Sequence, residues 1–350
     1  MGNFHWKLIE NIKNIIRISR NLFRWNEWFD SKVPLFFVTF YYLCLNSVIT
    51  SGQIILRLSL SIVFGCAYLS FGYFINDYYD RDLDLVAGKQ KTIQSLPDST
   101  ILSLFLILGV IGTIIALAMI QNKIFAILFI LVAYFLAIYY SKPPIRFKER
   151  GVWGLAVASF AQRAIPVLLI FGMFQHYELD SLLLLLLFAL IGMRWILVHQ
   201  LIDLENDQKS GISTFATQSG YTWTIRLTKW VIFPLELACI SALFYSTAAH
   251  DPILWIMPIL YGLVVLVNWF IWKGHEQPYR FTTFSRQPLE DFYYVYWPLG
   301  LVLILAIKQP IFWLVFLFNL IWQGSYIFNH GRTAIHLTKS KFQKGLKYGE

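Results

Sequence analysis

Four aspartates and an asparagine stand together in residues 76–84, where the sequence reads Asn-Asp-Tyr-Tyr-Asp-Arg-Asp-Leu-Asp. On a helix, Asp77, Asp80 and Asp84 lie within about 60° of one another, whereas Asp82 points to the opposite side. Carboxylates stacked on one face repel, so a cation should neutralise them. Their oxygens suit Mg²⁺, which completes its shell with water and substrate phosphate. We therefore predict a Mg²⁺ site here, with a solvated acidic helix end as the plainer alternative.

A second acidic cluster occupies residues 203–207, Asp-Leu-Glu-Asn-Asp, and is followed by Gln-Lys-Ser-Gly. Asp203 and Asp207 are one helical turn apart and face together, whereas Glu205 lies on the far side of the helix. An aspartate pair at this spacing is weak evidence by itself. Facing the first cluster across a cavity, however, the pair would help to hold Mg²⁺ ions around a diphosphate leaving group.

A basic loop lies between the two clusters, at residues 140–151, Tyr-Ser-Lys-Pro-Pro-Ile-Arg-Phe-Lys-Glu-Arg-Gly. Lys142, Arg146, Lys148 and Arg150 are candidates to bind phosphate oxygens, and arginine can do so with two hydrogen bonds. The same basic residues also fit a cytoplasmic loop that only sets membrane topology. The loop therefore allows both interpretations.

The composition of this chain indicates that lipid surrounds most of it. Of 350 residues, 57% are hydrophobic and 14% charged, and the mean hydropathy of +0.56 exceeds that of a soluble domain. The net charge of +9 is spread between apolar runs rather than gathered on one face, which argues against nucleic acid as a partner. Cys44, Cys66 and Cys239 lie inside apolar runs without metal-ligand spacing, so neither a disulfide framework nor a zinc site is indicated.

Apolar segments long enough to approach the thickness of a bilayer recur along the chain. We therefore predict an all-α, polytopic transmembrane bundle around a central cavity. Pro298 and Pro310 interrupt the last two segments, so the bundle has nine or ten spans. The ten segments lie at residues 33–50, 54–76, 101–120, 124–140, 152–174, 181–202, 229–248, 252–272, 291–307 and 310–328.

The distribution of Lys and Arg among the connections sets the orientation. It places both termini, both acidic clusters and the basic loop on the cytoplasmic side, in a bacterial inner membrane or an organellar membrane. The chain then divides into an amphipathic amino-terminal segment at 1–32, a membrane domain at 33–328 and a basic cytoplasmic tail at 329–350. The two acidic clusters end the second and the sixth segments, four helices apart, which suggests two similar halves.

These motifs resemble those of the UbiA-type superfamily of intramembrane prenyltransferases. The resemblance covers about residues 30–275 and rests on Asn76-Asp77-x-x-Asp80-x-x-x-Asp84, the loop at 140–151 and Asp203-x-x-x-Asp207. The chain departs from the family at Lys89-Gln90-Lys91-Thr92, where many members have Asn-Arg-Pro, and at Asn206, where glycine is common.

The resemblance implies an enzyme that moves a polyprenyl group from its diphosphate to an aromatic or other lipophilic acceptor, with Mg²⁺ as cofactor and membrane lipid around it. It also implies roles for particular residues. The catalytic and metal-binding residues would be Asp77, Asp80, Asp84, Asp203 and Asp207, and the diphosphate-binding residues Asn76, Lys142, Arg146 and Lys209.

Two other classes of membrane protein use acidic residues. A CDP-alcohol phosphotransferase would carry an Asp-Gly-x-x-Ala-Arg run, which this sequence lacks. A secondary transporter would place its acidic residues near the bilayer midplane, whereas both clusters here end predicted helices. Arg163, Arg194 and His199 do lie within the predicted spans, so each is also a candidate site residue.

Overall fold

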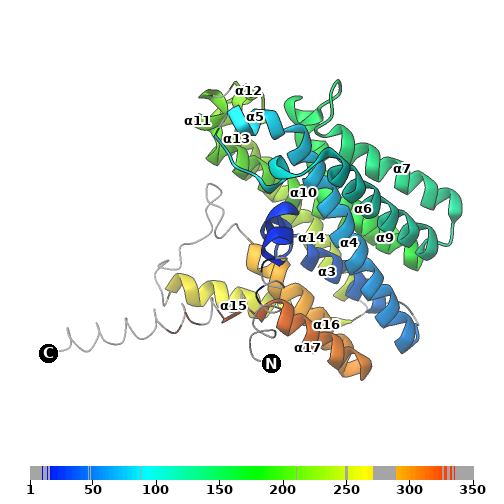
Figure 1. The fold of residues 1–350 in the computed structure, drawn as a ribbon. Helices are drawn as coiled ribbons and strands as arrows, with labels where there is room; N and C mark the ends of the chain where they lie inside the picture. Colours follow the sequence, from blue (N-terminus) through cyan, green and yellow to red (C-terminus); the bar gives the residue numbers. More distant parts are fainter. Residues whose placement is uncertain are drawn as a thin grey trace.

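The computed structural model describes residues 16–45, 47, 49–86, 88–209, 211–248, 251–270 and 289–324, and six isolated positions, 10, 14, 327, 328, 332 and 335. Within these residues every regular element is helical, which confirms the predicted all-α class (Figure 1). Much of the predicted amphipathic segment at 1–32 and nearly all of the tail at 329–350 lie outside the described residues.

The described helices coincide with the ten predicted apolar segments. Five are long and apolar enough to cross a membrane: α4 (Ser51–Tyr79), α6 (Asp98–Met119), Val152–Phe174, α10 (Leu179–Ile202) and Tyr221–Ala248. Shorter apolar helices are α3 (Val33–Leu45), α7 (Lys123–Tyr139), α15 (Ile256–Phe270), α16 (Trp297–Lys308) and α17 (Ile311–Trp322). Lengths and composition of this kind fit an integral membrane protein.

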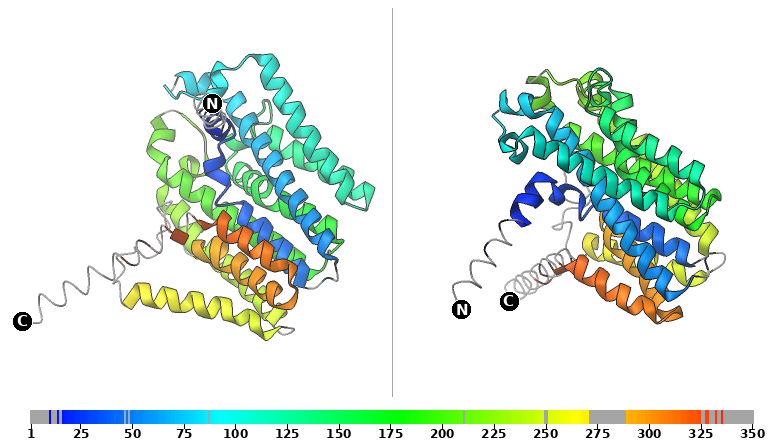
Figure 2. Two further views of the ribbon diagram at one scale, coloured as in Figure 1. Left: turned by 60° about the horizontal axis from the view of Figure 1, so that its bottom comes forward. Right: turned by 45° about the vertical axis from the view of Figure 1, so that its right-hand side comes forward.

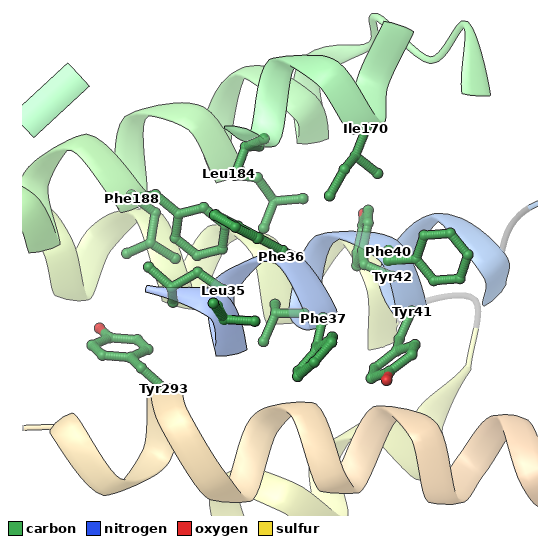
Figure 3. Close-up of a cluster of buried hydrophobic side chains, with 14 of the residues drawn as sticks. Leu35, Phe36, Phe37, Phe40, Tyr41, Tyr42, Ile170, Leu184, Phe188 and Tyr293 are labelled. Atoms are coloured by element: carbon green, nitrogen blue, oxygen red, sulfur yellow. The ribbon is translucent and has the colours of Figure 1, made fainter. Parts of the chain in front are cut away.

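Helix α3 forms the centre of the bundle. All of its residues except Leu45 are buried, as expected for a helix that is apolar on every side. Figure 3 shows Leu35 and Phe36 of α3 lying between Phe188 of α10 and Tyr293, near the start of α16. On α6 and α7 many apolar side chains are exposed instead, which suits helices that face lipid.

Three helical segments contain a turn of π-helix. These turns are η3 (Phe160–Ala164) between α8 (Val152–Ser159) and α9 (Ile165–Phe174), η4 (Thr228–Ile232) between α13 (Tyr221–Leu227) and α14 (Phe233–Ala248), and η6 (Phe292–Tyr296) before α16. A π turn inserts one extra residue and re-aims the side chains around it, and such turns are frequent at functional sites. Here they carry Arg163, Tyr293 and Tyr294.

Short helices gather at one end of the bundle. In Figure 1, α5 (Arg81–Val86), α11 (Leu204–Lys209) and α12 (Phe215–Ser219) all lie at the same end, and the views in Figure 2 agree. The basic loop with η2 (Phe147–Glu149) follows α7, and η1 (Thr92–Ser95) follows α5. This end therefore holds the two acidic clusters that the sequence singled out.

Candidate active site

The first acidic cluster spans the junction between α4 and α5. The sequence analysis treated it as part of one helix, but α4 ends at Tyr79 and Asp80 caps it with φ −97° and ψ −2°. Because the Asp84 amide still donates to the Asp80 carbonyl at 2.8 Å, the helical phase survives the break. The side chains of Asp77, Asp80 and Asp84 are 5%, 18% and 12% exposed. That of Asp82 is 87% exposed. Three carboxylates thus turn inward and the fourth faces solvent.

Basic side chains from other segments hold the inward carboxylates. Lys91, from the loop after α5, places Nζ 2.6 Å from an Asp77 oxygen and 2.7 Å from an Asp84 oxygen. Arg24, before α2 (Trp25–Trp28), contacts Asp77 at 3.3 Å. Burial opposes the charge of Lys91, but its contacts with the two aspartates outweigh this effect and raise its pKa. The cluster therefore has the electrostatics of a cation site.

The basic loop contacts the same cluster through two of its residues. Arg146 lies 3.1 Å from Asp80, and Lys148 also pairs with Asp80. Burial lowers the pKa of Lys148 more than the charge of Asp80 raises it. The other two candidate phosphate ligands of this loop lie elsewhere. Lys142 lies 5.8 Å from the centre of the Tyr139 ring, and Arg150 donates to the Pro144 carbonyl at 3.0 Å.

Asn76 is fixed by the same loop. The Ser141 hydroxyl donates to the Asn76 amide oxygen at 2.7 Å, and Lys148 Nζ lies 3.4 Å from that oxygen. Arg146 has a φ of +42°, a conformation that is uncommon outside glycine and is often found at functional sites. The loop is therefore shaped to hold Asn76 and Asp80 together.

The second cluster repeats the local structure of the first. Asp203 caps α10 with φ −88° and ψ 0°, and the Asp207 amide donates to the Asp203 carbonyl at 2.9 Å. Glu205 is exposed, as Asp82 is in the first cluster. Burial, together with the charge of Asp203, raises the pKa of the Asp207 carboxyl. A bound cation would relieve both effects.

Glycine ends both short helices in the same way. Gly88 stands four residues after Asp84 and Gly211 four residues after Asp207, with φ of +72° and +68°. The next amides, of Lys89 and Ile212, donate back to the carbonyls of Asp84 and Asp207 at 2.8 and 2.9 Å. This is the Schellman ending of a helix, which needs a left-handed residue. The sequence therefore encodes one aspartate-bearing unit twice.

The two clusters approach one another through their loops. The charge of Lys89, after the first cluster, acts on Asp207 in the second. Among the described residues, no hydrogen bond or ion pair joins a carboxylate of one cluster directly to a residue of the other. His199 Nδ1 lies 2.8 Å from an Asp203 oxygen, and Lys209 is exposed at the end of α11. The structure thus places the clusters at one end of the bundle, with the first more enclosed.

The sequence analysis did not identify every residue of this site. It gave Lys91 and Arg24 no role, and it weighed Lys148 only as one of four basic residues in its loop. Their connections to the aspartates run between 14 and 68 residues along the chain. No pattern of helical spacing predicts such contacts, because they depend on how the loops fold over α4.

A second group of possible metal ligands, His176, Glu178 and Asp180, lies at the amino-terminal end of α10. Asp180 already accepts hydrogen bonds from the Tyr42 hydroxyl at 2.8 Å and the Ser181 amide at 2.7 Å, and it contacts His176 at 2.9 Å. These contacts explain the group without a metal ion, as polar residues that join α3 to α10.

A family model matches the sequence, and solved structures match the fold. The model of the UbiA prenyltransferase family matches residues 35–287. A UbiA homolog from Archaeoglobus fulgidus bound to DMAPP and Mg²⁺ is similar in structure, with a TM-score of 0.59 and 16% identity over 83% of this chain and 98% of that one. The same homolog bound to GPP and Mg²⁺ has a TM-score of 0.57, with 18% identity over 85% and 99%.

A structure described under the biosynthesis of digeranylgeranylglyceryl phosphate synthase in membranes is also similar. Its TM-score is 0.53, with 16% identity over 85% of this chain and 96% of that one. No curated protein sequence matches this chain significantly. At these identities the structural matches establish the fold.

Proposed function

Because this chain belongs to the UbiA prenyltransferase family, we propose that it uses Mg²⁺ to transfer a prenyl group from its diphosphate to a lipophilic or aromatic acceptor. The protein is an integral membrane prenyltransferase with an all-helical fold. The stripe formed by Asp77, Asp80 and Asp84 is the observation that carries the proposal for Mg²⁺. It gathers three partly or fully buried carboxylates on one face, whose charges basic side chains offset in this structure and a bound metal ion would also offset.

The donor atoms of this stripe fit Mg²⁺. They are hard carboxylate oxygens, and basic side chains occupy them in this structure as a cation would. We assign the metal to Asp77, Asp80, Asp84, Asp203 and Asp207. When bound, Mg²⁺ supplies Lewis-acid stabilisation of the charge that develops on the leaving diphosphate. The relatives from Archaeoglobus fulgidus, which bind Mg²⁺ with DMAPP or GPP, support this proposal.

We propose that the basic side chains around the stripe also bind the diphosphate of the donor. Lys91, Arg24, Arg146 and Lys148 would turn from the carboxylates to the phosphate oxygens of the donor. Lys142 and Lys209 remain proposed diphosphate ligands, as does Asn76, which Ser141 already holds in place. This arrangement binds the diphosphate and opposes its negative charge where that charge grows.

The reaction breaks the bond between C1 of the prenyl group and the diphosphate oxygen, and the electron pair leaves with diphosphate. The nucleophilic carbon or oxygen of the acceptor forms the new bond to C1 and loses a proton. The fold would contribute by excluding water from the allylic cation, since the apolar core includes Ile75 and packs against Tyr79 of α4, beside the aspartates.

We also propose an orientation of the chain in its membrane. Both termini and the site would lie on the cytoplasmic side of a bacterial inner membrane or an organellar membrane, with residues 33–328 as the transferase domain. The gathering of α5, α11 and α12 at one end supports a shared side for both clusters.

Turnover with and without metal tests the proposal. Purified protein is given farnesyl diphosphate and a lipid extract that contains acceptors, and the diphosphate released is measured. We expect release with Mg²⁺ or Mn²⁺ and none in excess EDTA. Equal release in EDTA would refute the metal role, and no release under either condition would refute prenyl transfer from this donor.

A further inference from the structure

One ammonium group bridges two carboxylates of the aspartate stripe. Lys91 Nζ lies 2.6 Å from an Asp77 oxygen and 2.7 Å from an Asp84 oxygen. A metal ion shared by these two carboxylates would have to lie between the same two oxygens, about 2.0–2.1 Å from each in the case of Mg²⁺. The ammonium group and such a metal ion therefore exclude each other.

The lysine fits this position less completely than a metal ion would. Its ammonium group donates a hydrogen bond to Asp77. The Asp84 oxygen that faces it is buried and accepts no hydrogen bond from any described residue, so charge alone holds that contact. A metal ion bonds directly to a carboxylate oxygen and needs no aligned N–H group. Lys91 thus neutralises Asp84 without satisfying it.

The backbone around Lys91 is anchored, whereas its side chain is a flexible tether. The Lys91 amide donates to Gln94 Oε1 at 3.0 Å, and Gln94 Nε2 donates to the Lys89 carbonyl at 3.0 Å. Ile93 belongs to a small apolar cluster with Leu22, Phe74 and Ile101. Lysine carries its charge on a four-carbon stem with several rotatable bonds. The ammonium group can therefore change partners while the loop stays in place.

The other cations at the stripe are bound differently. Arg24 makes its closest contact with Glu27, at 2.5 Å, and reaches Asp77 only at 3.3 Å. The two cations of the basic loop that reach the stripe both contact Asp80. Within the described part of the chain, Lys91 alone forms ion pairs with two carboxylates of the stripe. Exchange of this one side chain would therefore free two carboxylates at once.

We propose that Lys91 is an exchangeable counter-ion that keeps the metal off Asp77 and Asp84 until the diphosphate of the donor draws its ammonium group away. This inference rests on the proposed function and adds an order of binding to it, in which metal and donor enter together. The diphosphate offers the ammonium group new oxygen partners when the metal takes its former ones. Without donor, the lysine offsets the buried carboxylates and the site holds metal only weakly.

Binding of Mn²⁺ in the absence of any prenyl diphosphate tests this role. Electron paramagnetic resonance follows Mn²⁺ titrated into the purified full-length protein. Lys91→Met should bind Mn²⁺ at least about 10-fold more tightly than wild type, because no ammonium group competes for the two carboxylates. Lys91→Arg, which keeps the charge, should stay close to wild type.

A matched control separates competition at the stripe from a general effect of charge. Arg81 pairs with Asp82 at 3.5 Å and with Asp98 at 3.1 Å, on the outward side of the same cluster. Arg81→Met removes the same charge as Lys91→Met but frees no carboxylate of the stripe. Its affinity for Mn²⁺ should therefore stay within about 2-fold of wild type.

The coupling between metal and donor provides a second measurement. The titration is repeated with an unreactive thio-analogue of farnesyl diphosphate. In wild type the analogue should tighten Mn²⁺ binding, and Mn²⁺ should tighten binding of the analogue by the same factor. In Lys91→Met this factor should be about 10-fold smaller, because part of it comes from displacement of the lysine.

Thermal unfolding distinguishes an exchangeable counter-ion from a purely structural lysine. In excess EDTA, Lys91→Met should melt below wild type, since Asp77 and Asp84 have lost a counter-ion. Mn²⁺ alone should restore its melting temperature, because the metal takes the place of the ammonium group.

Several results would overturn the inference. These are an affinity of Lys91→Met for Mn²⁺ equal to that of wild type, a gain no larger than that of Arg81→Met, and a Lys91→Met protein that Mn²⁺ does not stabilise. Failure of wild type to bind Mn²⁺ even with the analogue would instead refute the metal role in the proposed function.

Discussion

Asp80 and Asp203 hold the same position in two copies of one local structure. Each caps a long helix with nearly the same backbone angles, φ −97° and ψ −2° for Asp80 and φ −88° and ψ 0° for Asp203. Each accepts the amide of an aspartate four residues later, at 2.8 and 2.9 Å. The bundle thus presents two equivalent aspartate pairs at one end, which is an arrangement suited to metal ions around a diphosphate.

The shared geometry predicts which carboxylates matter for turnover. Asp80→Ala and Asp203→Ala should each lower kcat by about 10²-fold or more, since each removes a ligand that holds the metal where leaving-group charge develops. Asp82→Ala and Glu205→Ala are the matched controls, because these exposed side chains occupy the equivalent outward positions. Diphosphate release by well-folded protein is the measurement. A loss with Asp82→Ala as large as with Asp80→Ala would contradict the one-face arrangement.

The two glycines that end α5 and α11 predict an effect on metal affinity. Gly88→Ala and Gly211→Ala should each strain a left-handed residue by about 1–2 kcal/mol and loosen the loop after an aspartate pair. The concentration of Mg²⁺ that gives half-maximal turnover should therefore rise in both variants. Gly52→Ala, in the first turn of α4 with open space around it, is the control. A requirement for Mg²⁺ equal to that of wild type would show that these turns do not shape the site.

The basic loop allows a comparison between two lysines. Lys148→Met should raise the KM for the prenyl diphosphate more than Lys142→Met does, because Lys148 contacts Asp80 and Asn76 whereas Lys142 lies against Tyr139. Initial rates at varied donor and saturating Mg²⁺ measure both values. The reverse order would mean that the loop rearranges when the donor binds.

The buried ion pair between Arg194 and Glu236 predicts that substitutions of its two residues have non-additive effects on stability. Glu236→Gln should lower the free energy of unfolding by about 3–5 kcal/mol, because it removes the carboxylate charge that faces the buried Arg194. The double variant Arg194→Met with Glu236→Leu should recover most of that loss. Thermal unfolding in detergent measures the three proteins. A double variant less stable than Glu236→Gln would show that the pair itself, rather than the loss of the opposing charge, sets the stability.

Much of the fold could be predicted from hydropathy, and the reason is physical. A bilayer requires long apolar helices, so the positions of α4, α6 and α10 are visible in the sequence. The π turns within three of the helical segments were not visible, because an extra residue in a helix leaves its composition unchanged. The break at Asp80 was also missed, since it barely alters the helical phase.

The site could be predicted only for residues that share a helix. Periodicity separated Asp77 from Asp82, and the exposure of their side chains, 5% and 87%, follows that separation. Lys91 and Arg24 reach the aspartates from loops, and Arg163 reaches the Ser31 carbonyl, just before α3, only through the packing of the helices. Such contacts belong to tertiary structure, which spacing along one helix does not encode.

The central claim is that both aspartate pairs together hold a metal and a prenyl diphosphate. Electron paramagnetic resonance of Mn²⁺, titrated into purified protein with an unreactive thio-analogue of farnesyl diphosphate, measures this binding directly. We predict tight binding of Mn²⁺ that requires the analogue and is lost in both Asp80→Ala and Asp203→Ala. Binding that persists unchanged in Asp203→Ala, or that does not depend on the analogue, would contradict the claim.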